Sequence, residues 1–193
     1  MNEEEKELIQ LTKKRTRIKK EIVDVKWIVE IVCISFILSF LLSFVSQKAI
    51  PNINVFLGIL ITLLIIFINI LFDAIGVSVT ASDEKVFNSM AARKVKAAKQ
   101  AVIFKKNADK VSTFCCDVIG DICGVISGAC GTNITLIMVN TFHFDLLITG
   151  IIVAAVIASL IIGGKAIGKS FAINNSNIIL YEFARVISFF HKI

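Results

Sequence analysis

The sequence predicts an all-α fold, an integral membrane helical bundle of about four transmembrane helices with amphipathic helices at the membrane interface. Composition is the first reason, because 56% of the 193 residues are hydrophobic, whereas soluble domains average about 45–50%. Segment length is the second reason, because the apolar blocks are long enough to cross roughly 30 Å of hydrocarbon. The mean hydropathy of +0.82 agrees with both.

The expected domain organisation follows from these blocks. Residues 27–172 are expected to form the transmembrane domain, with spans at about 27–46, 52–74, 111–139 and 144–166. Residues 1–26 are expected to form a cytoplasmic amphipathic basic helix, and residues 82–110 a basic helical loop between the second and third spans. Residues 173–193 are expected to form a cytoplasmic amphipathic helix beside the membrane.

Charge placement predicts the orientation. Lysine and arginine gather before the first span, between the second and third spans and after the fourth, while the other two connections hold only Lys48. The positive-inside rule therefore places both termini in the cytoplasm of a multi-pass protein, and we expect a bacterial inner membrane. The net charge of +6 predicts anionic inner-leaflet lipids as partners. Nucleic acid is not an expected partner, because aromatic residues are not interleaved with the basic ones.

The N-terminal segment has apolar residues at near-heptad spacing, interrupted by Arg15. An amphipathic helix on the inner leaflet is favoured over a coiled coil, because three heptads with an arginine in the seam make a weak one. The first span then carries a serine stripe at spacings of four, four and three: Ser35, Ser39, Ser43 and Ser46. Such a stripe is typical of close packing between transmembrane helices.

The second span gathers polar residues toward its cytoplasmic end. Gly58, Thr62, Asn69, Asp73 and Gly76 share one face of the helix. Glycine at this end lets the backbone bend and offer carbonyl oxygens. Two interpretations of Asp73 stay open: it faces the acidic residues of the third span, or it lies at a hydrated helix end.

Two helical regions are predicted beside the membrane. Ser82-Asp83-Glu84 is typical of a helix start, with a capping serine followed by acids in the first turn. The residues after it place apolar positions among many lysines, which predicts one or two basic amphipathic helices. The last segment has Ile179, Phe183 and Ile187 among charged residues and is predicted to lie along the membrane.

The third span contains two acids inside a glycine-rich apolar run. In helical geometry Asp117, Asp121, Gly124 and Gly128 fall on one face, with Gly120 beside it. A carboxylate in hydrocarbon costs roughly 2.5–3.5 kcal/mol on insertion scales, so two of them predict a partner or a bound ion. The alternative is a membrane boundary just after Asp121, which leaves both carboxylates in the headgroup region.

The fourth span ends in the segment 163–170, which satisfies the phosphate-loop pattern G-x-x-x-x-G-K-[ST]. A phosphate loop needs a preceding strand, a following helix and an acid on a neighbouring strand. We do not expect nucleotide binding, because the preceding residues belong to a span-length apolar block. Nor is an enzyme expected, because no serine or cysteine has a base at a recognisable spacing. The five cysteines are interpreted as small buried hydrophobes.

Residues 52–190 resemble, in the order of their elements, the transmembrane domain of the cyclin M / CorC magnesium-efflux family, without its cytosolic regulatory domains. Residues 164–172, Gly-Lys-Ala-Ile-Gly-Lys-Ser-Phe-Ala, are similar to the family's G-E-x-x-P-K-T-L-A turn. Residues 98–101 and 109–113 are similar to its A-K-x-A and D-R-L-L-S-T stretches. The chain departs from the family at Lys165, where the family has glutamate, at Gly168, where it has proline, and in an extra first span.

Taken with this resemblance, the residues predict a membrane protein that binds and transports a divalent cation, magnesium above all. Mg²⁺ prefers oxygen ligands, which carboxylates and backbone carbonyls supply. Asp73, Asp117 and Asp121 are the expected ligands, Gly76, Gly124 and Gly128 would allow close approach, and Lys165 and Lys169 would couple charge. No cofactor other than this ion is expected, and a homodimer is the expected assembly.

The alternative is a non-transporting structural or regulatory membrane subunit. Its acids would pair internally with Lys165 or Lys169, and its basic loops would bind lipid or a partner.

Overall fold

The computed structural model describes residues 25–49 and 54–190. Almost all of the amphipathic helix expected at residues 1–26 lies outside this part of the chain, as do residues 191–193. The chain divides into two compact units, residues 1–37 and residues 38–193, which are described separately. Helix α2 (Val25–Ala49) contributes to both units. In its serine stripe, the Ser35 hydroxyl donates to the Ile31 carbonyl.

The all-α prediction is confirmed, since the described residues contain helices and no strand. After α2 the helices are α3 (Val55–Ala81), α4 (Glu84–Ala92), α5 (Ala98–Lys106), α6 (Ala108–Ser112), the π-helical η2 (Thr113–Ile119), α7 (Gly120–Phe142), α8 (Leu146–Asn174) and α9 (Ser176–Phe190). Four helical segments are long and apolar enough to cross a membrane: Lys26–Phe44, Val55–Ala81, Ala108–Phe142 and Leu146–Asn174.

Two of the helices continue beyond the spans expected within them. The second span was expected at residues 52–74, and α3 continues to Ala81; the fourth was expected at residues 144–166, and α8 continues to Asn174. Both boundaries had been placed where polar residues begin. Polarity does not end a helix, because backbone hydrogen bonding continues until a residue with a competing conformation intervenes. At Ser82 the backbone becomes extended, and this ends α3.

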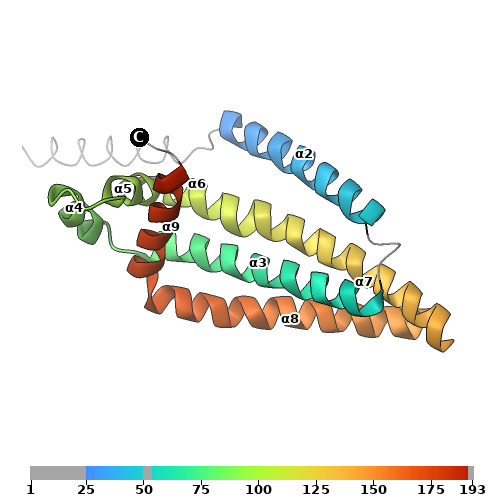
Figure 1. Ribbon diagram of the computed structural model, residues 1–193. Coiled ribbons are helices and arrows are strands. Elements are labelled where there is room, and N and C mark those ends of the chain that lie inside the picture. The colour runs from blue at the N-terminus through green and yellow to red at the C-terminus, as the bar shows by residue number, and fades with distance from the viewer. Residues whose placement is uncertain (1–24, 50–53, 191–193) are drawn as a thin grey trace, which may run out of the picture. The chain divides into compact units, whose positions relative to one another are not determined.

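Helices α3, α7 and α8 form the three-helix bundle of the second unit and lie side by side in Figure 1. Its interior is unusually polar, because several of its buried side chains are Thr62, Asn69, Asp73, Ser127, Thr135 and Thr149. Its outer surface is apolar: Phe56 on α3 and Ile167 on α8 are about three-quarters exposed, at 76% and 75%. Exposure of such an apolar surface to water is unfavourable, whereas contact with lipid chains is not. This distribution of polar residues inside and apolar residues outside matches a membrane-embedded bundle.

Glycines set the close contact between α3 and α8. A Cβ added at Gly164 would collide with Ile70 of α3, and one added at Gly168 would lie 3.0 Å from the same side chain. Gly164 and Gly168 are four residues apart and so share one face of α8, the small-residue spacing typical of close helix packing in membranes. The whole segment 163–170 is α-helical, so the residues that match the phosphate-loop pattern form a packing surface and not a loop.

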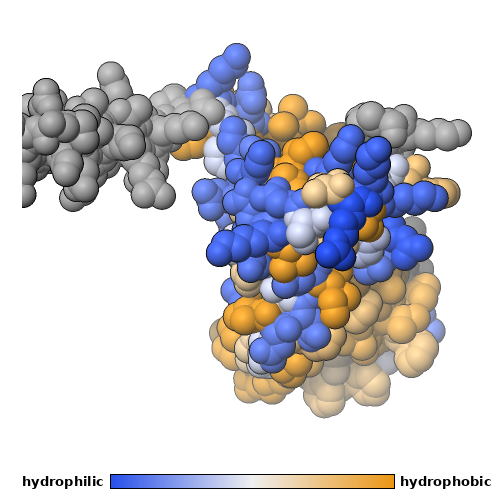
Figure 2. Space-filling view, turned by 90° about the vertical axis from the view of Figure 1, so that its left-hand side faces the viewer, coloured by the Kyte–Doolittle hydropathy of each residue, from blue (hydrophilic) through white to orange (hydrophobic). Residues whose placement is uncertain are grey.

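Helices α4, α5, α6 and α9 lie together at the end of the bundle where α3 ends and the η2–α7 segment begins (Figure 1). We call these four helices, with the turns between them, the basic end. It has an apolar core formed by Val79, Phe87, Ala101, Leu180 and Ala184. Figure 2 looks onto the basic end and shows hydrophilic side chains gathered there with apolar ones between them. The expected basic amphipathic helices of residues 82–110 are therefore anchored by a small core of their own.

Side chains at the basic end satisfy the last backbone groups of α3. The Lys105 ammonium donates to the carbonyls of Val79 and Thr80 at 3.1 and 2.8 Å, where a cation also complements the helix dipole. The predicted capping role of Ser82 was wrong, because its hydroxyl donates backward to the Val79 carbonyl. Asp83 caps α4 instead, accepting from the Lys85 N–H at 2.9 Å.

The glycine contact gives a prediction with a matched control. Gly164→Ala should lower the free energy of unfolding in detergent by about 1–3 kcal/mol, because the new methyl group overpacks the contact with Ile70. Gly163→Ala should leave it unchanged or raise it by up to about 1 kcal/mol, because that site has open space and alanine favours the helix. Equal melting temperatures for the two variants would show that α3 and α8 do not depend on this contact.

Candidate functional site: a buried carboxylate between two lysines

Asp73 lies inside the bundle. It is 2% exposed and shares the buried face of α3 with Thr62, Ile66, Asn69 and Gly76. The helix continues for two more turns beyond it, to Ala81. The interpretation of Asp73 as a hydrated helix end was therefore wrong, and its charge must be balanced within the protein.

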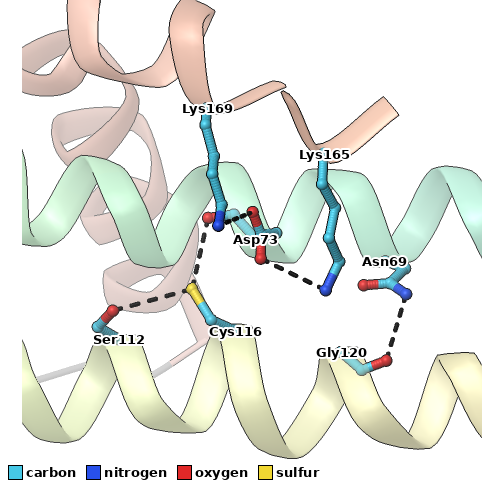
Figure 3. A network of polar contacts seen from close by, with 7 residues as sticks. All are labelled: Asn69, Asp73, Ser112, Cys116, Gly120, Lys165 and Lys169. Carbon is cyan, nitrogen blue, oxygen red and sulfur yellow. Dashed lines mark hydrogen bonds and ion pairs between the residues drawn. The ribbon is translucent and has the colours of Figure 1, made fainter. Parts of the chain in front are cut away.

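Two lysines of α8 provide that balance. The Lys165 ammonium lies 3.5 Å from Oδ1 of Asp73, and the Lys169 ammonium lies 3.8 Å from Oδ2. The two lysines are four residues apart, so both leave the same face of α8 and reach one carboxylate from two sides (Figure 3). Lys165 is the more enclosed, with 25% of its side chain exposed against 51% for Lys169. The pairing joins α8 to α3 by charge next to the glycine contact.

Asn69 connects the same face of α3 to α7. Its amide nitrogen donates to the Gly120 carbonyl at 3.2 Å, one turn of α3 away from Asp73 (Figure 3). A Cβ at Gly120 would stand 3.3 Å from the Lys165 nitrogen and 3.4 Å from Oδ1 of Asn69. Gly120 therefore leaves the space through which Lys165 reaches Asp73, and a larger residue would press on both side chains.

The π-helical segment η2 packs against α3 beside the carboxylate. The Cys116 thiol donates to the Asp73 carbonyl with a sulfur–oxygen distance of 3.6 Å and lies 3.8 Å from the Ser112 hydroxyl. A Cβ at Gly76 would collide with the Cys116 sulfur, so Gly76 allows this close approach. π-helical turns are rare and often occur at functional sites. Here the turn brings a thiol, and not a carboxylate, to the backbone of Asp73.

The formal charges of Asp73, Lys165 and Lys169 sum to +1. Two oxygens of this group, Oδ1 of Asn69 and Oδ2 of Asp73, have no hydrogen-bond donor within the described part of the chain, although Oδ2 faces Lys169 at ion-pair distance. We call these five residues, Asn69, Asp73, Gly120, Lys165 and Lys169, the ion cluster. It is a lysine-rich site with spare oxygen acceptors.

The two other predicted ligands lie elsewhere. Asp117 and Asp121 are exposed, and neither forms an ion pair with any described residue. Among the described residues, no three histidine, cysteine, aspartate or glutamate side chains are grouped so as to hold a metal ion. The expected triad of Asp73, Asp117 and Asp121 is thus not assembled. A helix turns about 100° per residue, so the neighbouring positions Cys116 and Gly120 face α3 in place of the two aspartates.

The glycines expected at the cation site also separate into two groups. Gly76 does allow close approach, as described, but a Cβ at Gly124 or Gly128 would meet nothing within 4 Å. Gly124 and Gly128 instead line an open groove of about 420 Å³ between α7 and α8, together with Gly150 and Ala154. The outward face of the continuous η2–α7 segment, which we call the acid–glycine face, comprises Asp117, Asp121, Gly124 and Gly128.

The sequence patterns missed four residues that pack around the ion cluster. Cys116 and Ser112 were missed because a π-helical turn shifts the register of a face and has no clear sequence signal. The packing role of Gly164 and Gly168 had a signal, their spacing of four residues, which the overlapping phosphate-loop pattern obscured.

No protein-family model, characterised protein or solved structure matches the chain. The likeness to cyclin M / CorC proteins therefore rests on the residues quoted for it.

The ion cluster predicts a stability rescue. Replacing both lysines, Lys165→Met with Lys169→Met, leaves the buried Asp73 charge uncompensated and should lower the free energy of unfolding by about 3 kcal/mol. Adding Asp73→Asn should restore most of that loss, because no charge is then buried. Thermal unfolding in detergent would measure both effects.

The matched control for this rescue is Lys85→Met with Lys99→Met, which removes two exposed lysines of the basic end and should change stability little. If the triple variant were no more stable than the double variant, the lysines would not be balancing Asp73.

Proposed function

We propose that the chain is a non-transporting membrane subunit whose internal ion cluster locks its transmembrane bundle. The observation that carries the proposal is the placement of two lysines against one buried carboxylate. With a formal charge of +1, the group repels a divalent cation, and its contacts join α3, α7 and α8. Such a cluster favours one fixed arrangement of helices over a site that opens and closes.

The outward features of the bundle support a role in assembly. The acid–glycine face presents two exposed carboxylates within a segment long enough to span the membrane. Acidic residues at this depth are costly without a partner, and small residues beside them let another helix approach closely. The face therefore suits contact with a second transmembrane chain, including a second copy in a homodimer.

Orientation forms part of the proposal. The basic end carries Lys85, Arg93, Lys94, Lys96 and Lys99 as exposed residues, and it lies where α3 and α8 end. Facing the cytoplasm of a bacterial inner membrane, these charges would contact anionic lipid headgroups, worth about 1 kcal/mol for each residue near the surface. The orientation predicted from the positive-inside rule would therefore place these basic residues beside the anionic headgroups that they can bind.

Orientation can be measured with one introduced cysteine on each side, in a background where the five native cysteines are replaced by alanine. In a membrane-impermeant labelling experiment on intact cells, Asn140→Cys, near the end of α7, should be labelled from outside. Lys96→Cys, between α4 and α5, should be labelled only after the cells are opened. The reverse pattern would invert the orientation.

Divalent-cation transport is the second candidate, and one observation favours it. Oδ1 of Asn69 and Oδ2 of Asp73 are buried oxygens without a hydrogen-bond donor among the described residues, and the Gly120 carbonyl lies nearby. Oxygens of these kinds are the ligands that Mg²⁺ prefers. Both lysines would have to leave for a cation to enter, which is feasible for the half-exposed Lys169.

Magnesium titration separates the two candidates. For a structural subunit, we expect no saturable Mg²⁺ binding by calorimetry, and Mg²⁺ uptake into proteoliposomes equal to that of empty liposomes. Lys165→Met should not change either result. For a transporter, Lys165→Met should strengthen Mg²⁺ binding because it removes a competing charge, Asp73→Asn should abolish it, and Lys99→Met should leave it unchanged. Saturable binding with that pattern of variants would replace the subunit proposal.

A further inference from the structure

The open groove between α7 and α8, which we call the α7–α8 groove, lies outside the ion cluster. Small side chains of both helices form much of its lining: Gly124, Gly128, Gly131, Thr132, Gly150, Ala154 and Ala158. A Cβ added at Gly124 or Gly128 would meet nothing within 4 Å, so the backbone of α7 is accessible there. Helices in membranes approach one another most closely over surfaces of this kind.

The length of the groove matches a helix. On α7 its lining extends from Gly124 to Leu136, twelve residues or about 18 Å. On α8 it extends from Leu146 to Ile161, fifteen residues or about 22 Å. An occupant that follows the two spans for this distance is either a transmembrane helix or the chain of a lipid.

Two carboxylates at the inner end of the groove separate these possibilities. Asp117 and Asp121 share the acid–glycine face with Gly124, are exposed, and form no ion pair with a described residue. Asp121 lies about 32 Å from Phe142 at the other end of α7, near the inner limit of a hydrocarbon layer of roughly 30 Å. A basic side chain would complement the carboxylates at this depth, whereas the phosphate of a phospholipid would be repelled by them.

Two surfaces of this chain lack the required combination of small residues and positive charge. The same face of a second copy would bring Asp117 and Asp121 toward their own equivalents, because a two-fold dimer pairs a patch with itself, and like charges oppose that contact. The serine face of α2 has small residues, but Lys26 and Ser35 are nine residues apart and so lie on opposite sides of that helix. A different polypeptide fits the groove better.

We propose that the α7–α8 groove binds a transmembrane helix of another protein, with small residues at four-residue spacing and a lysine or arginine one turn nearer the cytoplasm. The small residues pack on Gly124 and Gly128, and the basic side chain pairs with Asp121 and Asp117. A basic residue at the cytoplasmic end of a span agrees with the positive-inside rule. The inference rests on the assembly role proposed above and narrows it to a partner of stated chemistry.

Binding can be measured with a synthetic transmembrane peptide in liposomes that contain the full chain. The probe is a leucine-rich helix with three glycines at four-residue spacing and one arginine a turn beyond them. Energy transfer from the peptide to a dye on Asn140→Cys, with the native cysteines replaced by alanine, should saturate at one peptide per chain. A peptide with leucine in place of arginine should bind at least ten-fold more weakly, and so should one with isoleucine in place of the glycines.

The carboxylates have a matched control on the chain. Asp117→Asn with Asp121→Asn should remove the preference for the arginine peptide over the leucine peptide. Glu84→Gln with Asp109→Asn neutralises two exposed acids of the basic end and should keep the preference. Equal affinity of the unchanged chain for the two peptides would overturn the basic partner.

The groove has its own matched pair of glycine variants. Gly124→Ile should weaken binding of the arginine peptide at least ten-fold, because its side chain occupies the groove. Gly163→Ile makes the same change at a glycine of α8 that also has open space but does not line the groove, and should weaken binding less than two-fold. Equal losses in the two variants would overturn the groove as the site.

Two further outcomes are decisive. Energy transfer between two labelled copies of the chain that Gly124→Ile abolishes would assign the groove to a second copy and overturn the partner proposed here. Failure of the peptide to bind, together with an absence of saturable Mg²⁺ binding, would overturn this partner and leave the role of the ion cluster intact. Saturable Mg²⁺ binding together with peptide binding would support the partner and overturn the non-transporting subunit, so the two proposals can fail separately.

Discussion

A buried carboxylate must be neutralised where it lies, and this constraint organises the bundle. Asp73 is almost completely enclosed within a span of apolar residues, so an unpaired charge there would cost about 3–5 kcal/mol, a large share of the roughly 5–15 kcal/mol by which folded domains are stable. Lys165 and Lys169 provide the opposite charge from α8. For their side chains to reach, α8 has to approach α3 closely, and Gly164 and Gly168 make that approach possible. Charge and packing therefore specify the same helix pair.

The third helix of the bundle is fixed by backbone groups. Asn69 uses the Gly120 carbonyl, and the Cys116 thiol uses the Asp73 carbonyl, so α3 and the η2–α7 segment share two polar contacts. Within hydrocarbon such contacts lack competition from water, although their measured net contribution in membranes is modest, averaging about 0.6 kcal/mol. Their main effect is to fix the rotation of α7. That rotation directs Cys116 and Gly120 inward and leaves Asp117 and Asp121 on the outward face.

The basic end has a different basis for its stability. Its helices bury Val79, Phe87 and Leu180 in an ordinary apolar core, and Lys105 covers the carbonyls at the end of α3. The bundle is polar inside and apolar outside, whereas the basic end is apolar inside and polar outside. This reversal within about 190 residues is what a chain needs when one part lies in lipid and the other in water.

The sequence by itself determined the all-α class, the four span-length helices and the buried face of α3, because apolar length and helical period depend on local order along the chain. It also indicated that Asp73 and the lysines of α8 carry charge that needs a partner.

Only the tertiary structure decided which groups meet. A rotation of about 100° per residue separates Asp121 from Gly120, so the sequence pattern could not tell which of them faces α3. The π-helical η2 adds a further shift of register, and the glycine contact with Ile70 selects the face of α8 that presents Lys165 and Lys169 to Asp73. Contacts between helices depend on their rotation and separation, and those are set by packing across the whole bundle.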